Sequence, residues 1–310
     1  MKLSVVICTY NPKLAILEKV IQALQKQSLS RDAWELVVVD NCSQPPLSTG
    51  LNLCWHPNGR IIVEPKPGLF HARVAGVNAC TTSLVVFVDD DNVLSEDYLE
   101  KSYRFAKVHP QVGCFGGRSL PVFETAPPDW FKDTGINLGC QDYGPELHIS
   151  NYSTTRFAFQ QYPEKAPIGT GMVILKQAFN SYLEEAGNSP ERTRLGRKGK
   201  SLSSGEDNDI ILSIVKKGYE LAYVPELVVH HLIPATRYSE DYLKRMAFES
   251  NRTWVKVLEI HGINPWKKIS RFSYRPRQIK SYLINKAWKS PLSAVRWKSA
   301  CGLFKGLSEI

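Results

Sequence analysis

Five apolar residues lead directly into three acidic ones in the stretch Leu84-Val85-Val86-Phe87-Val88-Asp89-Asp90-Asp91. An uninterrupted apolar run of this length is typical of a strand that is buried on both faces of a parallel sheet. Three adjacent carboxylates at the end of such a strand repel one another, and burial raises the cost of keeping them charged. The stretch therefore predicts a parallel α/β sheet with a positively charged partner at the end of this strand.

Similar apolar segments recur along the first hundred residues and alternate with segments of helical period. Expected strands cover residues 3–8, 34–39, 61–64 and 84–88. The first expected helix has Pro12 in its first turn and an apolar face over residues 16–24, and further helices are expected over residues 69–79 and 95–109. This alternation indicates βαβ units, and hence a mostly parallel sheet flanked by helices. Asn11 is expected to cap the first of these helices.

Polar residues follow three of the expected strands. Thr9, Tyr10 and Asn11 follow the first strand, Asp40 follows the second, and the aspartates begin at Asp89. Because ligands of open α/β sheets bind beyond the carboxyl ends of the strands, these polar groups should converge on one edge of the sheet.

The middle of the chain is less regular. Residues 112–175 carry weaker periodic signals, and residues 187–205 hold Gly, Ser and five basic side chains, so a mobile loop is expected there. A helix should begin at Gly205-Glu206, with carboxylates at the positive end of its dipole, and should stop at Gly218. Two further apolar runs are expected to form strands at residues 221–224 and 227–231.

The composition excludes several classes of protein. The chain has 310 residues, of which 43% are hydrophobic and 22% are charged, so it is neither wholly disordered nor fibrous. Its apolar runs are far shorter than a membrane-spanning helix requires, and its start does not resemble a signal peptide. Seven scattered cysteines without a Cys-x-x-Cys pair suit free thiols. These features predict a cytoplasmic protein.

The charge is concentrated at the C-terminal end. The net charge is +9, yet residues 251–310 hold 13 basic and only 2 acidic residues. A basic helical region is therefore expected over residues 236–310, following a first domain over residues 1–235. Its lysines and arginines alternate with Trp, Leu and Phe, which suits a helix at an anionic membrane surface through residues 270–310. Packing against the rest of the chain, with a solvated basic face, is the alternative.

A divalent cation is the natural partner for the three aspartates. Carboxylate oxygens suit Mg²⁺ or Mn²⁺, and such an ion with few protein ligands commonly holds substrate phosphates. Asp40 is placed to accept a hydrogen bond from a base, and Thr9 and Tyr10 are placed to pack against a nucleoside. The alternatives are a solvated acidic turn for the aspartates, a closed turn at Asp40 and a core position for Tyr10.

Taken in order, these motifs resemble those of the family 2 glycosyltransferases. The resemblance begins at Ser4-Val5-Val6-Ile7-Cys8-Thr9-Tyr10-Asn11 and covers about residues 3–235. It continues through Val37–Ser43, Gly68-Leu69 with Ala72-Arg73, Val86–Asp91, Gly169–Met172, Gly205-Glu206-Asp207 and the histidines at 230 and 231. It implies a GT-A (Rossmann-like) α/β fold, a nucleoside diphosphate-sugar donor with UDP favoured, a divalent metal and inversion at the anomeric carbon.

The resemblance also implies roles for individual residues. Thr9, Tyr10 and Asp40 would hold the nucleoside, with Asn11 and Asp90 beside them, and Arg73 would lie near the ribose or diphosphate. Asp89 and Asp91 match the ends of the family's Asp-x-Asp motif, so Asp91 would bind the metal and Asp89 the ribose or a metal-bound water. His231, with His230 second, would help to hold the metal and diphosphate. Asp207 would be the general base, and Glu206 would orient donor or acceptor.

Some positions depart from the family pattern or have simpler explanations. Val74 stands where Asn often follows the Ala-Arg pair, and Asn92 stands where an acidic residue is common. Gly169–Met172 suits either a close approach of the backbone to a sugar or a tight turn before a strand. The carboxylates at 206–209 suit a helix cap as well as catalysis.

The predicted function is therefore transfer of a sugar to a hydroxyl of a glycan or lipid-linked acceptor, in the cytoplasm or peripherally on the inner face of a membrane. The alternatives are a catalytically inactive nucleotide-sugar binder and a sugar-phosphate nucleotidyltransferase, although the Gly-rich start of the latter is absent from the sequence. A dinucleotide oxidoreductase is disfavoured because Thr9–Pro12 replaces the required Gly-x-Gly-x-x-Gly. Nucleic acid is not an expected partner, since no nucleic-acid-binding motif is recognised.

Overall fold

The computed structural model describes residues 2–150, 161–199 and 201–310. By its internal contacts the chain forms two compact units. Unit 1 comprises Met1–Val122, Gly139–Thr193 and Ile210–Leu232, and unit 2 comprises Phe123–Leu138, Arg194–Asp209 and Ile233–Ile310. The division into domains over 1–235 and 236–310 concerns independent folding and stays a prediction.

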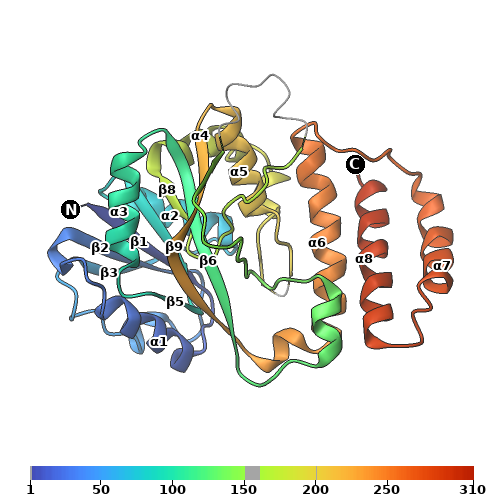
Figure 1. The fold of residues 1–310 in the computed structure, drawn as a ribbon, viewed down its shortest axis with the longest axis horizontal. Helices are drawn as coiled ribbons and strands as arrows, with labels where there is room; N and C mark the ends of the chain where they lie inside the picture. The colour runs from blue at the N-terminus through green and yellow to red at the C-terminus, as the bar shows by residue number, and fades with distance from the viewer. Residues whose placement is uncertain (1, 151–160, 200) are drawn as a thin grey trace. The chain divides into compact units, whose positions relative to one another are not determined.

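Unit 1 is built on a mixed sheet in the order β3-β2-β1-β4-β8-β6-β9-β5, with β7 paired to β9 (Figure 1). The first four strands are parallel and occur where the apolar runs predict them. Their bounds are β1 Leu3–Thr9, β2 Trp34–Asp40, β3 Gly59–Val63 and β4 Leu84–Asp89. In this half the prediction of a parallel sheet is confirmed.

The other half of the sheet pairs antiparallel. Its strands are β5 Asn92–Leu94, β6 Val112–Phe123, β7 His148–Ser150, β8 Val173–Leu175 and β9 Glu220–Ile233. Strand β8 pairs antiparallel with β4 and β6, and β9 pairs antiparallel with β5 and β7. β6 lies in the segment whose pattern is irregular, and β9 joins two predicted strands into one.

Side chains of the central strands alternate between two apolar layers. Leu3, Val5 and Ile7 of β1 belong to one layer, whereas Val6 belongs to the other, with Val37 and Val39 of β2. The first layer includes residues of helices α1 (Leu14–Gln25) and α3 (Tyr98–Val108). The second includes residues of α2 (Leu69–Ala79), α4 (Lys176–Ala186) and α5 (Glu206–Lys216). The layers therefore cover both faces of the sheet, as a parallel sheet requires.

The prediction that Asn11 caps the first helix is wrong. Helix α1 begins at Leu14, and its N-cap is Lys13, which makes no side-chain capping bond. Asn11 has a positive φ of 49°, and its side-chain oxygen accepts a hydrogen bond from the backbone N–H of Gln44, 2.7 Å away. Asn11 thus ties the end of β1 to the loop after β2, because an Asx side chain tolerates the left-handed conformation needed there.

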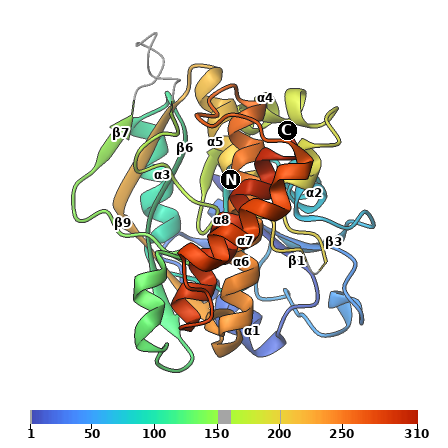
Figure 2. The same cartoon turned by 90° about the vertical axis from the view of Figure 1, so that its right-hand side faces the viewer.

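The C-terminal part of unit 2 is helical, as the sequence predicts. The helices are α6 (Glu240–Ile260), α7 (Tyr274–Ile284) and α8 (Pro291–Leu307), and the segment between α6 and α7 contains the 3-10 helix Arg271–Ser273. Helix α8 packs against both α6 and α7 (Figures 1 and 2). In α8 the side chains of Val295, Cys301 and Leu307 are buried. For α8, therefore, packing is the observed role of the apolar residues.

No helix in the three described ranges, 2–150, 161–199 and 201–310, is long and apolar enough to cross a membrane.

The end of the chain is held to α6 by charged side chains. Glu309 accepts two hydrogen bonds of 2.8 Å from the guanidinium of Arg252, and Lys256 Nζ lies 2.9 Å from its carboxylate. Burial alone would raise the pKa of Glu309, but these partners outweigh it and lower the pKa from 4.5 to about 2. The carboxylate is therefore charged, and stabilising, over most of the pH range.

Replacing Glu309 with glutamine should lower the free energy of unfolding at pH 7 by about 2 kcal/mol, since a partly buried, charge-assisted hydrogen-bond network is weakened. Because the folded pKa lies below the unfolded one, the stabilisation is complete above about pH 4.5 and is lost as the pH falls through about 2. Urea unfolding of both proteins across this range measures the difference. Glu240→Gln, at an exposed i,i+4 pair with Lys244, is the control. An equal loss at all pH values would contradict the linkage.

Candidate active site

The carboxyl ends of β1 and β4 meet at the centre of the sheet. Strands β2 and β3 lie on one side of β1, and β4 lies on the other, so the chain changes direction between β1 and β4. Such a topological switch point is where open α/β sheets bind ligands. Here the hydroxyl of Thr9, which is buried, donates a hydrogen bond to the carboxylate of Asp90. The structure thus brings two of the predicted residues into contact.

Asn92 holds the aspartate turn in shape. Its side-chain oxygen accepts a hydrogen bond of 3.2 Å from the backbone N–H of Asp89, and its amide donates one of 3.0 Å to Oδ1 of Asp91. Asn92 is completely buried. An acidic residue at this position could not donate to Asp91, so the departure from the family pattern has a structural role that the sequence does not reveal.

Strand β9 brings His231 to the same turn. The antiparallel pairing of β5 with β9 places Asn92 opposite His231, and the backbone N–H of Leu232 donates to the carbonyl of Asp91. Nε2 of His231 lies 3.3 Å from Oδ2 of Asp91, and His231 is 3% exposed. His230 is exposed, as expected for the neighbouring position of a strand, whose side chain points to the opposite face.

Cys140 is a further neighbour of His231. Its sulfur lies 3.8 Å from Nδ1, so the imidazole has a partner at each nitrogen. A partner at the second nitrogen orients a histidine that binds through the first. Cys140 carries no motif in the sequence, and only the tertiary structure reveals this contact.

The donor set at this turn fits a hard divalent cation. The Asp91 oxygen and the His231 nitrogen are close enough to bind one ion together. Within the described part of the chain, no group of three or more His, Cys, Asp or Glu side chains is arranged to hold a metal ion. An ion held by these two residues would take further ligands from phosphate oxygens or water, which is common for Mg²⁺ and Mn²⁺.

Asp40 closes the loop that follows β2. It is 3% exposed. Its Oδ1 accepts a hydrogen bond of 2.9 Å from the backbone N–H of Ser43, and its Oδ2 accepts one of 2.8 Å from that of Leu47. Burial alone would raise the pKa of Asp40, but these hydrogen bonds outweigh it and lower the pKa below its ordinary value. The carboxylate is therefore charged at neutral pH, with lone pairs left to accept from a ligand.

The loops after β1 and β2 are fastened to each other. The backbone N–H of Asn11 donates to Oγ of Ser43 at 2.9 Å. Asn41 donates to the carbonyls of Glu64 and Lys66 and accepts from the N–H of Gly68. Tyr10, the first residue of the loop after β1, is 50% exposed and is not a core residue. Its ring is available to a ligand.

Arg73 lies on α2 and is 3% exposed. Its guanidinium carbon is 5.3 Å from the centre of the Phe87 ring, on β4. A cation over an aromatic face is stabilised by the ring quadrupole, and the ring also orients it. The structure therefore places Arg73 over the strand that leads into the aspartates.

The glycine-flanked segment 169–172 forms a tight turn before β8. Gly171 has a φ of 71°, and a Cβ there would lie 2.6 Å from Val229 and 2.8 Å from the hydroxyl of Tyr98. The Tyr98 hydroxyl donates to the carbonyl of Gly171. Glycine is thus required at position 171 by conformation and by packing, which is the simpler of the two predicted explanations.

Glu206 and Asp207 form the first turn of α5, where the sequence predicts a helix to begin, and Gly218 follows its end with a φ of 88°. Both acidic residues belong to unit 2. Glu206 is 2% exposed, and Gly196 makes room for its carboxylate, since any Cβ there would overlap it. Asp207 is half-buried. Of these two carboxylates, that of Glu206 is therefore enclosed and that of Asp207 is accessible.

Helix α6 fixes the start of α5. A Cβ on Gly205 would lie 2.5 Å from the Thr253 side chain, so only glycine allows this approach. Asp209 Oδ1 lies 2.7 Å from Nε2 of His261, the residue that ends α6, and both side chains are fully buried. His261 is a positioning residue that the sequence does not reveal, because it lies far from Asp209 along the chain.

The segment 187–205 is partly packed. Arg192 is 7% exposed and donates to Glu185 at 3.0 Å and to the hydroxyl of Ser213, which ties the segment to α4 and α5. A 3-10 helix forms at Arg192–Arg194, and Leu195 is buried. Lys200 lies outside the described residues. The described residues of the segment, 187–199 and 201–205, form neither α-helix nor strand, which agrees with the predicted loop, and its mobility stays a prediction.

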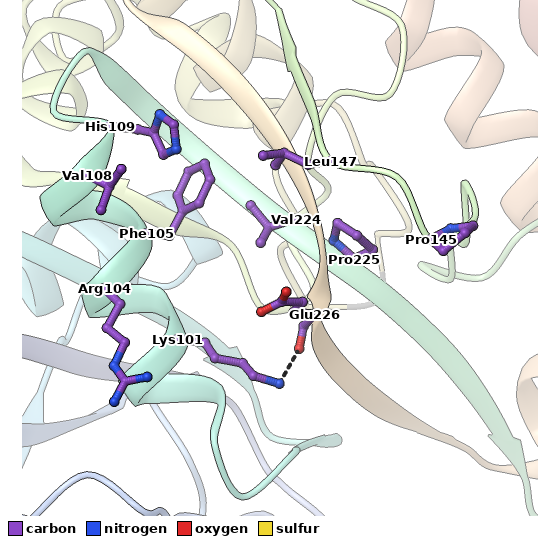
Figure 3. A pocket seen from close by; sticks show the side chains of 10 residues that line it. All are labelled: Lys101, Arg104, Phe105, Val108, His109, Pro145, Leu147, Val224, Pro225 and Glu226. Atoms are coloured by element: carbon purple, nitrogen blue, oxygen red, sulfur yellow. Dashed lines mark hydrogen bonds between the residues drawn. The ribbon is translucent and has the colours of Figure 1, made fainter.

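Unit 1 also contains a cavity of about 370 Å³ between α3 and β9 (Figure 3). None of the residues predicted to bind nucleotide or metal lines it. The lining residues are Lys101, Arg104, Phe105, Val108, His109, Pro145, Leu147, Val224, Pro225 and Glu226. Lys101 reaches toward the carbonyl of Glu226 at 3.5 Å. The cavity and the aspartate turn therefore share no residue.

Comparison with known proteins places this geometry in a family. The chain is 22% identical over 277 residues to the O-antigen chain rhamnosyltransferase RfbN of Salmonella typhimurium. The aligned region covers 86% of this chain and 74% of RfbN. Two solved structures share the fold. S. aureus TarS 1–349 in complex with UDP-GlcNAc has a TM-score of 0.50 and 15% identity, covering 100% of this chain and 91% of the TarS 1–349 chain.

The other structure is the mannosyltransferase PcManGT from Pyrobaculum calidifontis in complex with GDP-Man and Mn²⁺. It has a TM-score of 0.53 and 20% identity, covering 95% of this chain and 73% of that one. The predicted GT-A fold is therefore confirmed. The family model for glycosyl transferase family 2 matches residues 4–183, more than half of the chain and including all the aspartates of the turn. The protein belongs to glycosyl transferase family 2.

Proposed function

We propose that the protein is an inverting glycosyltransferase that moves a sugar from a nucleoside diphosphate-sugar, with UDP favoured, to a hydroxyl of a glycan or lipid-linked acceptor. The observation that carries this proposal is the meeting of Asp91 with His231 at the sheet edge where Thr9 contacts Asp90. Acidic and imidazole donors at a switch point suit a nucleoside diphosphate held through a cation.

In this proposal the sheet edge binds the nucleoside. Asp40 accepts a hydrogen bond from the N–H of the base, since its carboxylate is charged and held in place by Ser43 and Leu47. Tyr10, half-exposed, stacks on the base, with Thr9, Asn11 and Asp90 lining the site. Arg73 lies near the ribose or diphosphate, and Asp89 binds the ribose or a water.

Asp91 and His231 would hold Mn²⁺ or Mg²⁺, with Asp89 close by in sequence. A bound cation of this kind neutralises the charge that develops on the leaving diphosphate. Asn92 and Cys140 contribute by orienting the two ligands.

Asp207 is the proposed general base. It takes the proton of the acceptor hydroxyl as the hydroxyl oxygen bonds to the anomeric carbon, and the bond from that carbon to the diphosphate oxygen breaks on the opposite face. Configuration at the anomeric carbon is thereby inverted. Glu206, in the same helical turn, orients donor or acceptor. Within unit 2, the close approach of Gly205 to Thr253 and the contact of Asp209 with His261 hold this turn against α6.

The comparisons support the choice of substrates. RfbN is named as an O-antigen chain rhamnosyltransferase, and the neighbouring structures are complexes with UDP-GlcNAc and with GDP-Man and Mn²⁺. We propose that the protein acts in the synthesis of a surface polysaccharide or glycoconjugate. The proposed location, in the cytoplasm or on the inner face of the membrane, does not rest on these comparisons.

A thermal-shift panel tests the donor site. Diphosphates of uridine, thymidine, guanosine and cytidine, and their sugars, are added with and without Mn²⁺. We expect one nucleotide to raise Tm only with Mn²⁺, because binding to the folded state stabilises it by about 2.7 kcal/mol at 100 times the Kd. No shift with any nucleotide would contradict the site, and a metal-dependent shift without turnover toward any acceptor would favour an inactive binder.

A further inference from the structure

Helix α7 turns its polar side chains inward and its apolar side chains outward. Tyr274, Gln278, Ser281 and Asn285, spaced by four, three and four residues, are half-buried or buried. The Trp297 indole of α8 donates to the carbonyl of Gln278 at 3.1 Å, and Lys305 of α8 lies over the Tyr274 ring. The polar stripe of α7 therefore faces α8. An ordinary surface helix does the reverse, with its apolar side toward the protein and its polar side toward solvent.

The opposite stripe is apolar and exposed. Its members are Phe272, Pro276, Ile279 and Leu283, at the same four-three-four spacing, followed by Ile284 and Trp288. Phe272 is 93% exposed, Ile279 65%, Leu283 58%, Ile284 67% and Trp288 56%. These six residues are the apolar stripe of α7: four lie in the helix itself, Phe272 precedes it in the 3-10 helix Arg271–Ser273, and Trp288 follows it. Single exposed apolar residues are ordinary, but a cluster of them on a helix and its flanks marks an interaction surface.

Cations surround this stripe. Arg275, Lys280, Lys286 and Lys289 are exposed beside it. The sequence contains no acidic residue between Glu259 and Glu309, so the region lacks the carboxylates that would neutralise them locally. Apolar residues flanked by Lys and Arg match a helix that lies in a bilayer interface, with the apolar side in the acyl boundary and the cations at the headgroups.

We propose that α7 and its flanks dock the protein on an anionic lipid bilayer, with the apolar stripe inserted and the four cations at the headgroups. A second copy of the same surface would bring like charges together, and a nucleic acid offers no apolar partner for the stripe. The docking surface goes beyond the transfer reaction and does not rest on it.

Vesicle co-sedimentation of the full chain tests the proposal without nucleotide or acceptor, so its outcome is independent of the proposed function. The vesicles are phosphatidylcholine alone or mixed with phosphatidylglycerol, at low and at physiological salt. We expect binding to the mixed vesicles that weakens with salt. Ile279→Ser/Leu283→Ser should weaken it by about tenfold or more, and Lys280→Gln by about fivefold.

A matched control comes from α3 in unit 1. Val108 is 71% exposed and Lys107 is exposed beside it, so Val108→Ser and Lys107→Gln change the same kinds of residue on another helix. Both should leave vesicle binding unchanged. Three results would overturn the proposal: no binding to the mixed vesicles, equal loss in the α3 and α7 variants, or a dimer in lipid-free solution that Ile279→Ser/Leu283→Ser dissolves.

Discussion

Replacement of Asp207 with asparagine is expected to lower kcat by about 10²- to 10⁴-fold and to leave the Kd of the donor near its wild-type value. Asparagine has nearly the same shape as aspartate but cannot take a proton from the acceptor hydroxyl. Asp207 is the accessible carboxylate of the first turn of α5, and Glu206 beside it is enclosed. The loss should therefore fall on the chemical step rather than on binding.

The measurement pairs steady-state transfer with donor titration of the same protein. A fall in kcat without a change in donor Kd is the signature of a group that acts only in the transition state. Asp241→Asn is the matched control, because Asp241 also lies in the first turn of a helix in unit 2 but is exposed and paired with Lys244. Full activity of Asp207→Asn would move the base to another residue.

Replacement of Asp91 with alanine is expected to remove the metal-dependent part of donor binding. The change deletes a carboxylate that lies 3.3 Å from His231 and accepts from Asn92. Loss of a directly bound anionic ligand should raise the Kd of the nucleotide measured with Mn²⁺ by at least about 100-fold. The Kd measured without metal should change little.

Isothermal titration with Mn²⁺ and the nucleotide identified by thermal shift measures both values. Asp97→Ala is the control, because Asp97 lies six residues further along the chain, at the start of α3, and is paired with Lys101 at 2.7 Å. An unchanged Mn²⁺ titration of Asp91→Ala would exclude Asp91 as a ligand. Together, Asp207→Asn and Asp91→Ala separate the proton-transfer step from the binding step.

Much of unit 1 was predictable because its signals are local. The run 84–88 is apolar on both faces of a strand, and the polar residues Thr9, Asp40 and Asp89 end β1, β2 and β4, which are parallel neighbours. Parallel strands end on one edge, so the position of these residues in the fold follows from the strand pattern alone. The start and stop of α5 follow from Glu206 and Gly218 in the same way.

Side-chain partners were less predictable. Asn11 has the residue type of a helix cap, yet it binds Gln44, because the loop after β2 offers a backbone N–H that competes with the helix. Asn92 stands where an acidic residue is common, which suggests a weaker metal site, yet its amide group holds the turn through hydrogen bonds to Asp89 and Asp91. In both cases the local pattern specifies a polar side chain but not the group that it meets.

The sequence alone specifies the parallel half of the sheet and the edge that carries the aspartates, because strand and helix periodicity act over a few residues, and its ordered motifs identify the family. The antiparallel half, the contacts of His231 with Asp91 and Cys140, and the contact of His261 with Asp209 emerge only in the folded chain. The fold also determines the exposure of the apolar side chains of the two basic helices: Val295, Cys301 and Leu307 of α8 are buried, whereas Ile279 and Leu283 of α7 are exposed. Each of these depends on strand register or helix packing between segments far apart in the chain, which local periodicity does not specify.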